Sequence, residues 1–235
     1  KPGALDKGIE LAKGELLLFT DADCLVNQNW IMSITKTFIN QKSDLVASFT
    51  LVEYNKFFGK FQAVEWLMSH TMASGGIGFG FTLGCFGNNM AITKDMYNKV
   101  GGYKKIPFSV TEDLALLQAV DKLGGKLNYI CTEESTVITK PIDTVINYLK
   151  QRKRLAMGRS SIGWKAVFFV VTSLLIWLSA IVSLSVGNLY LASMILLLKV
   201  ISDTILVLPS LLTVKEYKLI PYVIPSSIIF LLVEL

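Results

Sequence analysis

The sequence predicts an α/β domain followed by transmembrane helices, and three observations support this fold class. Strand-like and helix-like segments alternate over residues 1–160, as they do where helices pack on a sheet. Residues 166–186 carry no charge and are as long as a membrane span, which needs roughly 20 residues. Of the 235 residues, 52% are hydrophobic and 17% are charged, whereas about a quarter are charged in average soluble chains.

The cysteine and histidine content excludes several kinds of site. The three cysteines, Cys24, Cys85 and Cys131, form no C-x-x-C pair, so neither a disulfide framework nor a cysteine zinc cluster is expected. The single histidine, His70, excludes a multi-histidine metal site. Because the chain begins with residues 1–3 (K-P-G) and stops inside an apolar run, we expect a fragment of a longer protein.

Six segments of the first part have a clear hydrophobic period. Strands are expected from Glu15 to Thr20 and from Asp44 to Tyr54, and helices at 4–12, 29–40, 57–72 and 111–123. The first strand has the continuous apolar pattern of a buried parallel strand. The helix at 57–72 has one apolar face, typical of packing against a core or a membrane surface, formed by Phe57, Phe61, Val64, Met68 and Met72.

Residues 161–235 are expected to form the membrane region. Spans are expected at about 166–186 and 189–212, joined by a short uncharged connector that suits a helical hairpin. A third segment, from residue 220, is either a truncated span or an interfacial segment. The second span contains Lys199 and Asp203, which lie one helical turn apart and could pair with each other.

Basic residues at the edges of the spans predict the orientation. Six of them lie between Lys150 and Lys165, before the first span, and Lys215 and Lys218 follow the second. Both flanks should therefore face the cytoplasm, which makes the chain an integral membrane protein with a cytoplasmic N-terminal domain. The first cluster fits plain topology signalling and an added role in substrate binding equally well. Nucleic acid is not expected as a partner, because the positive charge gathers at the membrane edge.

The strand expected at 15–20 ends in an acidic motif, Asp21-Ala22-Asp23. Ligands bind at the carboxyl ends of strands in open α/β sheets, and residues two apart in an extended chain point to the same side. Asp21 and Asp23 could therefore converge on a hard cation or a metal-bound diphosphate, although an acidic surface turn explains them equally well. An EF-hand is excluded, because Leu25, Val26 and Met32 stand where a ligand, a glycine and a glutamate are needed.

A phosphatase is one alternative explanation of the same motif. Haloacid-dehalogenase-like phosphatases also have D-x-D after an apolar strand, with the first aspartate as the nucleophile. The local pattern resembles that family and would give this role to Asp21. However, Leu25 stands where the family usually has threonine or valine.

Two further motifs each have two interpretations. Thr111-Glu112-Asp113 opens the expected helix at 111–123, either as a Thr111 cap with acids that offset the helix dipole or as a carboxylate general base at a cleft. Gln151 and Arg154 lie three residues apart on one helical face, where an amide and a guanidinium could hold a phosphorylated or polyoxygenated ligand. The alternative for this pair is the basic cluster at the membrane edge.

Two residue patterns are expected to be structural. Residues 75–80 (G-G-I-G-F-G) should form a flexible loop, because they lack the preceding strand and the complete motif of a nucleotide-binding loop. His70 lies beside Trp66 on the helix at 57–72 and is expected to be a hydrogen-bonded structural residue.

Taken in order, these motifs resemble those of the membrane-integrated family 2 glycosyltransferases, which include the cellulose, chitin, hyaluronan and poly-N-acetylglucosamine synthases. Five segments carry the resemblance. Residues 1–14 match the family's K-x-x-A-L-N-x-G…A-x-G stretch, and residues 19–23 match its D-x-D strand end. Residues 87–103 match its acceptor-side segment. Residues 111–113 match its T-E-D motif, and residues 151–155 match its Q-x-x-R-W motif. Leu155 replaces the tryptophan of the last motif, which weakens the match to the long-polymer synthases.

The resemblance implies a fold and an activity. Residues 1–160 would be a partial GT-A domain, a Rossmann-like fold of nucleotide-diphospho-sugar transferases, followed by transmembrane helices over 161–235. The first nucleotide-binding strands of the family should precede Lys1, so this fragment alone should be inactive. The implied enzyme is an inverting glycosyltransferase at the cytoplasmic membrane face. It would use a nucleotide-sugar donor, with a UDP-sugar expected first, and a saccharide or lipid-linked acceptor.

The resemblance also implies roles for the matching residues. Lys1 would lie near the nucleotide diphosphate. Asp21 and Asp23 would hold the nucleotide and its Mg²⁺ or Mn²⁺, with Asp23 closer to the metal. Asp113 would be the general base that deprotonates the acceptor hydroxyl.

Four more positions are assigned to the acceptor or to the diphosphate: Glu112, Asn88, Gln151 and Arg154. A third hypothesis stays open beside the transferase and the phosphatase. A non-catalytic membrane scaffold or transporter component would explain Lys199 and Asp203, because charges inside a span often mark a transport pathway.

Overall fold

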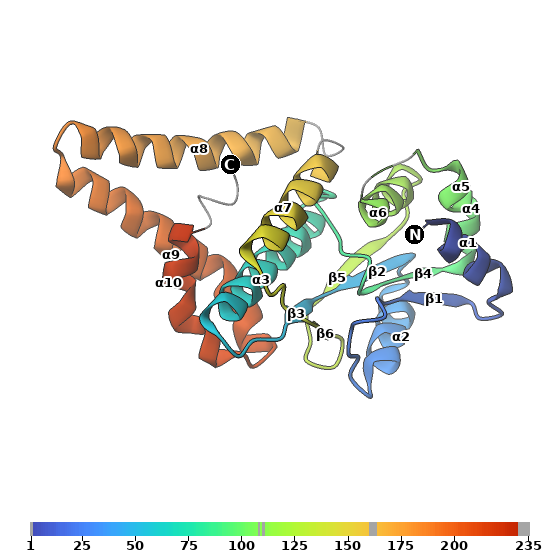
Figure 1. The fold of residues 1–235 in the computed structure, drawn as a ribbon. Coiled ribbons are helices and arrows are strands. Elements are labelled where there is room, and N and C mark those ends of the chain that lie inside the picture. The colour runs from blue at the N-terminus through green and yellow to red at the C-terminus, as the bar shows by residue number, and fades with distance from the viewer. Residues whose placement is uncertain (1, 108, 110, 160–163, 230–235) are drawn as a thin grey trace.

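The computed structural model describes residues 2–107, 109, 111–159 and 164–229, with the side chains of residues 2 and 158–170 outside this description. Its strands are β1 (Leu16–Phe19), β2 (Leu45–Ser48), β3 (Thr50–Val52), β4 (Met90–Thr93), β5 (Leu127–Ile130) and β6 (Val137–Thr139). The helices of the first part are α1 (Pro2–Leu11), α2 (Trp30–Gln41), α3 (Phe57–Gly78), α4 (Lys94–Lys99), α5 (Gly102–Lys105), α6 (Glu112–Lys122) and α7 (Val145–Arg159). Those of the last part are α8 (Trp164–Ser185), α9 (Leu189–Thr213), the 3-10 helix η2 (Tyr217–Tyr222) and α10 (Val223–Ile229), as Figure 1 shows.

A four-stranded mixed sheet has the order β1-β4-β2-β5. Strand β4 runs antiparallel to both neighbours, and its Ala91 lies opposite Leu18 of β1 and Val46 of β2. Strands β2 and β5 are parallel, with Ala47 opposite Tyr129. The sequence pattern of β1 suggested a parallel strand, but its partner in the described chain is the antiparallel β4. A continuous apolar run reports burial on both faces of a sheet and does not determine the strand direction.

The segment expected as one strand at 44–54 forms two strands in different sheets. Strand β2 ends just before Phe49, and β3 begins just after it and pairs in parallel with β6. Phe49 is buried, and its carbonyl accepts hydrogen bonds from the Val137 N–H at 3.1 Å and the Asn89 side-chain amide at 2.6 Å. These bonds to other segments replace the ladder of the first sheet at this residue.

Helices cover both faces of the four-stranded sheet (Figure 1). On one face, Leu45 and Ala47 of β2 belong to a core that includes α1 and α6. Val46, which alternates with them, packs on the other face with three buried residues of α2: Trp30, Ile34 and Phe38. The alternation follows from the period of two in a strand, and each face is dry because helices cover it.

Helix α3 is longer than expected, and the flexible loop predicted at 75–80 is wrong for its first four residues. The helix continues through Gly78, and Gly80 follows with a φ of +77°. A Cβ added at Gly76 would lie 2.8 Å from the Leu83 side chain and 2.9 Å from the Phe81 carbonyl oxygen. Glycine therefore allows the next segment to pack closely on the end of this helix.

The apolar face expected on this helix is buried only in its middle. Phe61, Val64 and Met68 are buried, whereas Phe57 and Met72, nearer the two ends of that face, are exposed.

One described helix, α9, is long and apolar enough to cross a membrane by its length and composition. The described apolar part of α8, at 171–185, is shorter than a span. The two helices pack against each other after a turn at Gly187, which has a φ of +74°. Lys199 Nζ lies 2.5 Å from Asp203 Oδ2, so the pairing expected within this helix is confirmed.

A second hydrophobic core joins α3 to the C-terminal helices. Val64 of α3 belongs to one cluster with Val207 and Leu211 of α9, and the cluster continues into η2 and α10. The hydroxyl oxygens of Thr71 on α3 and Ser210 on α9 lie 2.7 Å apart. Helix α3 therefore packs against the β3 strand on one side and against the apolar helices on another.

His70 is fully buried in α3 and hydrogen bonded on both ring nitrogens. The Thr50 N–H donates to Nε2 at 3.0 Å, and Nδ1 lies 2.5 Å from the Tyr129 hydroxyl oxygen. Because Nε2 accepts, the neutral ring carries its hydrogen on Nδ1 and donates it to Tyr129. Phe49 stacks on the ring with centroids 5.1 Å apart. The expectation of a structural histidine is confirmed.

The burial of His70 predicts an acid-dependent loss of stability. Burial lowers the pKa of His70 to about 3, from an ordinary value of 6.5. Between these values the unfolded chain binds a proton that the native state does not bind. The contribution of His70 to the free energy of unfolding should thus be complete above pH 6.5 and fall by about 1.4 kcal/mol per pH unit below it. In denaturant unfolding across this range, His70→Gln should show a shallower pH dependence than the wild type; an identical dependence would contradict this prediction.

Candidate active site

The acidic motif after β1 forms a tight turn. The Cys24 N–H donates to the Asp21 carbonyl oxygen at 3.1 Å, which closes a turn over four residues. The extended geometry expected for this motif is therefore wrong, because this backbone bond reverses the chain at once. Asp21 is half-buried and Asp23 is exposed.

Asp113 lies in the first turn of α6 and is held through both carboxylate oxygens. The Gly87 N–H donates to Oδ2 at 2.7 Å, and the Leu114 N–H donates to Oδ1 at 2.8 Å. Thr111 precedes the helix as expected, but its side chain makes no capping hydrogen bond. Its hydroxyl lies 3.3 Å from the Ser109 hydroxyl instead, so the expected Thr111 cap is wrong.

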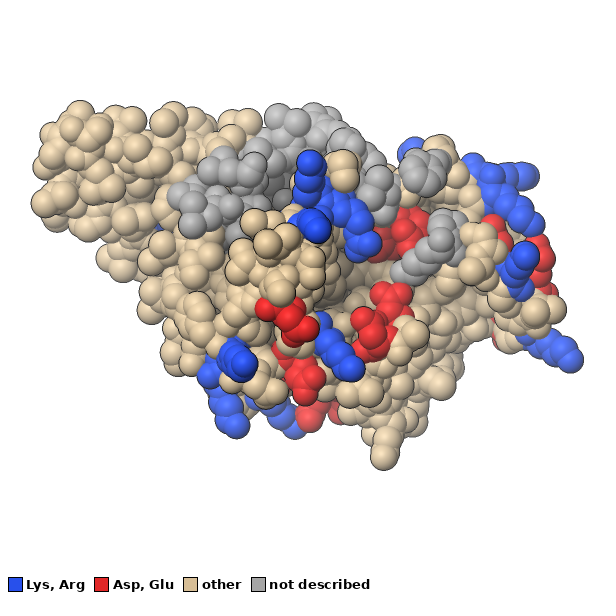
Figure 2. All heavy atoms as spheres, viewed as in Figure 1, with Lys and Arg blue, Asp and Glu red and all other residues tan. Residues whose placement is uncertain are grey.

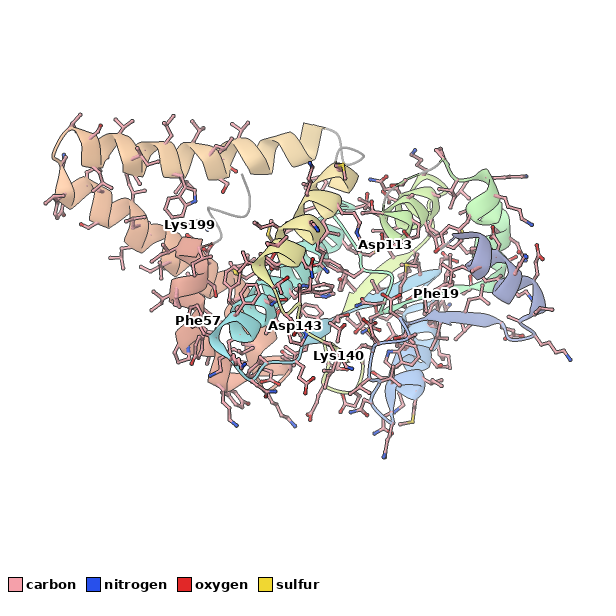
Figure 3. The ribbon with its side chains drawn as sticks, viewed as in Figure 1. Phe19, Phe57, Asp113, Lys140, Asp143 and Lys199 are labelled. Atoms are coloured by element: carbon pink, nitrogen blue, oxygen red, sulfur yellow. The ribbon has the colours of Figure 1, made fainter. Side chains whose placement is uncertain are left out.

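A pocket brings Asp21 of the first acidic motif together with the second motif, whereas Asp23 lies outside the pocket lining. Its lining includes Asp21 from the end of β1, Glu112 and Asp113 from the start of α6, and Gly87 from the segment before β4. Figure 3 shows Asp113 and Phe19 on the same part of the molecule, far from Lys199 on α9. Asp21 and Asp113 are 92 positions apart (113 − 21), and the sheet brings them into one pocket.

The charges of Glu112 and Asp113 affect the pKa values of two groups in the nearby core. Burial raises the pKa of the Cys85 thiol, and the charges of Asp113 and Glu112 raise it further. Burial also raises the pKa of Tyr103, with contributions from the same two carboxylates. Three carboxylates, those of Asp21, Glu112 and Asp113, line the pocket, and such a group attracts cations.

Asn88 lies beneath the acidic turn. It is buried, its Oδ1 accepts a hydrogen bond from the Thr50 hydroxyl at 3.0 Å, and its Nδ2 lies 3.9 Å from Cys24 Sγ. These contacts place Asn88 between the turn and β3. A role for its amide in acceptor binding stays a proposal.

The sequence reasoning missed the next residue, Asn89, which is fully buried. Its Oδ1 accepts from the Trp30 indole at 3.0 Å, and its Nδ2 donates to the carbonyl oxygens of Phe49 at 2.6 Å and Ser135 at 2.9 Å. One amide therefore connects α2, the break between β2 and β3, and the turn before β6. An asparagine directly before an apolar strand, in the segment G-N-N-M-A, is the pattern that could have identified it.

Gln151 and Arg154 lie on α7, outside the lining of the pocket with Asp113. Arg154 is exposed, and Gln151 is half-buried with an Oε1 that has no hydrogen-bond partner among the described residues. Figure 2 shows Lys and Arg side chains gathered over α7 on one side of a hollow, and Asp and Glu side chains on the other. Lys1, the remaining predicted residue, lies outside the described residues.

The residues fit a divalent cation that completes its coordination with substrate. The described chain holds no group of three or more His, Cys, Asp or Glu side chains that could form a closed metal site. Asp21 and Asp23 offer two carboxylates on one turn. Mg²⁺ is usually bound by one or two carboxylates together with substrate phosphates and waters, and Asp21 in the pocket lining is one carboxylate of this kind.

Comparison with known proteins identifies the family. The model of the family described as Glycosyl transferase family group 2 matches residues 16–224, which include the acidic turn, the start of α6 and all of α7. A search of curated proteins found no match. The family match extends over both predicted regions and favours a transferase over the phosphatase hypothesis. The chain belongs to glycosyl transferase family group 2 and is a glycosyltransferase.

Proposed function

We propose that this chain is the catalytic part of a membrane-bound inverting glycosyltransferase, with Asp113 as the general base. The observation that carries the proposal is the pocket shared by Asp113 and Asp21. A base for the acceptor and a carboxylate for the donor side must face the same reacting atoms, and this pocket supplies both. The donor is a nucleotide-sugar, with a UDP-sugar as the first candidate, and the acceptor is a saccharide or a lipid-linked sugar.

Asp113 has the fixed orientation that a general base requires. Its two oxygens accept from the Gly87 and Leu114 N–H groups, which fix the carboxylate in the pocket lining. In the proposed reaction, Asp113 removes the hydroxyl proton while the acceptor oxygen attacks the anomeric carbon from the face opposite the nucleotide. The bond to the diphosphate breaks as the new glycosidic bond forms, so the anomeric configuration inverts.

The donor side would be formed by Asp21, Asp23 and the basic residues. Asp21 and Asp23 would hold Mg²⁺ or Mn²⁺, which supplies charge neutralisation for the departing nucleotide diphosphate. Gln151 and Arg154 on α7 would steady the diphosphate or the acceptor, and Lys1 would lie near the diphosphate. Glu112 lines the pocket next to Asp113 and would contact the acceptor.

The apolar helices support a location in the membrane. Helix α9 and the described part of α8 expose large apolar side chains, including Leu178, Ile181, Leu197 and Ile205. Such a surface is expected to enter a bilayer. With the basic residues of α7 on the cytoplasmic side, the pocket would open to the cytoplasm, where nucleotide-sugars are found.

Asp113→Asn in the full-length protein should reduce sugar transfer by about a hundredfold or more, because removal of a general base costs about 10²- to 10⁴-fold. Nucleotide-sugar binding should be retained, since the amide keeps the size of the side chain. Asp121→Asn, on the exposed end of the same helix, is the matched control and should transfer normally. Normal turnover by Asp113→Asn would contradict the assignment, and absent nucleotide-sugar binding in the wild type would favour a non-catalytic scaffold.

Gly87→Ala should displace the base without removing it. An added Cβ would lie 3.1 Å from Asp113 Cβ and 3.4 Å from its Oδ2, closer than most Cβ contacts. We expect kcat to fall about tenfold, because small misplacements of reacting groups cost one to two orders of magnitude. Gly84→Ala is the control, since its Cβ would be 3.8 Å from Ala73, an ordinary contact. Equal kcat values for the two variants would show that the position of Asp113 is unimportant.

Chelation by EDTA should abolish transfer, and Mn²⁺ or Mg²⁺ should restore it. Asp23→Asn removes one of the two proposed ligands, so the Mn²⁺ concentration for half-maximal activity should rise by about tenfold or more. Asp143→Asn, an exposed aspartate in the segment between β6 and α7 and not on the acidic turn, should leave the Mn²⁺ requirement unchanged. A titration of activity against Mn²⁺ measures this, and activity that survives chelation would exclude the proposed metal.

A further inference from the structure

A buried polar cluster connects α3 to α7. It consists of Gln62 and Glu65 on α3 and Tyr148 and Arg152 on α7, and we call it the α3–α7 lock. The Tyr148 hydroxyl donates to Glu65 Oε2 at 2.8 Å, and Arg152 Nη1 pairs with Glu65 Oε1. The Arg152 guanidinium also lies over the Tyr148 ring, 5.0 Å from its centroid.

The lock differs in burial from the surface ion pairs of this protein. Glu65 is 1% exposed and the Arg152 side chain 10% exposed, whereas the pair of Lys104 and Glu10 is 70% and 61% exposed. Glu65 and Arg152 are also 87 positions apart (152 − 65), so the pair joins two separate helices.

The composition of the lock is not optimal for stability alone. Taking two charges out of water is costly, and apolar residues of similar size often stabilise a core as well or better. In addition, Arg152 Nε and Nη2 are buried with no hydrogen-bond partner among the described residues. The best-attested benefit of such buried polar pairs is that they select one geometry.

The geometry that the lock selects is the rotation of α7 about its axis. Tyr148 and Arg152 lie one helical turn apart and both contact Glu65, so they fix which face of α7 lies on α3. With 3.6 residues per turn, Gln151 and Arg154 project about 100° and about 160° around the axis from Arg152. Arg154, which is exposed, therefore points away from α3, whereas Gln151 projects to the side and its Oε1 is buried.

The start of this segment is fixed by Gln62. Its Nε2 donates to the Ile142 carbonyl oxygen, and its Oε1 accepts from the Ile142 N–H, both at 2.9 Å. This pairing of a side-chain amide with a peptide group sets the position of the chain three residues before α7 begins. Axial position and rotation are then both determined by two side chains of α3.

We propose that Glu65 is a positioning residue of the transferase, which acts by holding α7 so that Arg154 faces the substrate. The inference rests on the proposed function in one respect, the role of Arg154 at the diphosphate or acceptor. Glu65 itself is buried and touches no substrate. Its effect on the reaction passes through the orientation of α7.

The test uses the full-length protein in detergent micelles and two kinds of measurement. Amide hydrogen exchange of residues 145–157 reports the order of α7, and steady-state kinetics give the donor KM and kcat. The variants are Glu65→Gln, Tyr148→Phe, Arg154→Ala and the double variant Glu65→Gln/Arg154→Ala. Tyr148→Phe removes one hydrogen bond without leaving a charge unpaired, so it tests the lock even where Glu65→Gln folds poorly. Glu10→Gln, which breaks the exposed pair with Lys104, is the control.

We expect Glu65→Gln to speed exchange in α7 while exchange in α6 is unchanged, with a smaller effect in the same direction for Tyr148→Phe. The donor KM should rise about tenfold in Glu65→Gln and no further when it is added to Arg154→Ala, because residues that act as one unit are not additive. A residue that only stabilised the fold would give additive losses.

Unchanged exchange in α7 for both lock variants would overturn the proposal. Additive losses in the double variant, or a normal donor KM in Arg154→Ala, would overturn the route through Arg154. Failure of the proposed function gives a different pattern. In that case Asp113→Asn would retain transfer while the lock variants still loosened α7 and raised the donor KM together.

Discussion

The candidate active site depends on the hydrogen bonds of three consecutive residues, 87–89, just before β4. The backbone N–H of Gly87 holds Asp113, Asn88 lies under the acidic turn, and Asn89 connects three separate segments through one buried amide. A buried amide left without partners costs about 1–3 kcal/mol for each lost hydrogen bond, so this arrangement is strongly specified. The strand that follows, β4, lies between β1 and β2. The hydrogen bonds of residues 87–89 therefore also fix the position of a central strand of the sheet.

Helix α3 has a comparable role on the other side of the molecule. Val64 of α3 packs in the core with α9, and Glu65 forms an ion pair with Arg152 of α7. His70 accepts a hydrogen bond from the backbone N–H of Thr50 in β3. Helix α3 therefore carries contacts on several sides, and residues outside the apolar face expected from the sequence, such as Glu65 and His70, are buried as well. Through these contacts, one helix holds both α7, which carries the basic residues, and the apolar helix α9.

Much of this could be predicted from local sequence. The aspartates at 21, 23 and 113 are candidates from the sequence because a strand end and a helix start have short-range patterns, and two of them, Asp21 and Asp113, share a pocket. The pairing of Lys199 with Asp203 follows from helix spacing. The break at Phe49 and the antiparallel direction of β4 could not be predicted, because they depend on hydrogen bonds between distant segments. The lock was missed for the same reason, since Glu65 meets its partners only after the chain has folded.

The second core also has a practical consequence for work with this enzyme. A recombinant chain cut after α7 would leave Phe49, Leu51 and Val64 without Val207 and Leu211, their partners in the same cluster. Such a product would expose a new apolar surface on α3 and β3 and would be prone to aggregate. A shortened chain should therefore retain the part of α9 that contains Val207 and Leu211, or carry polar replacements of the apolar α3 residues that this part covers.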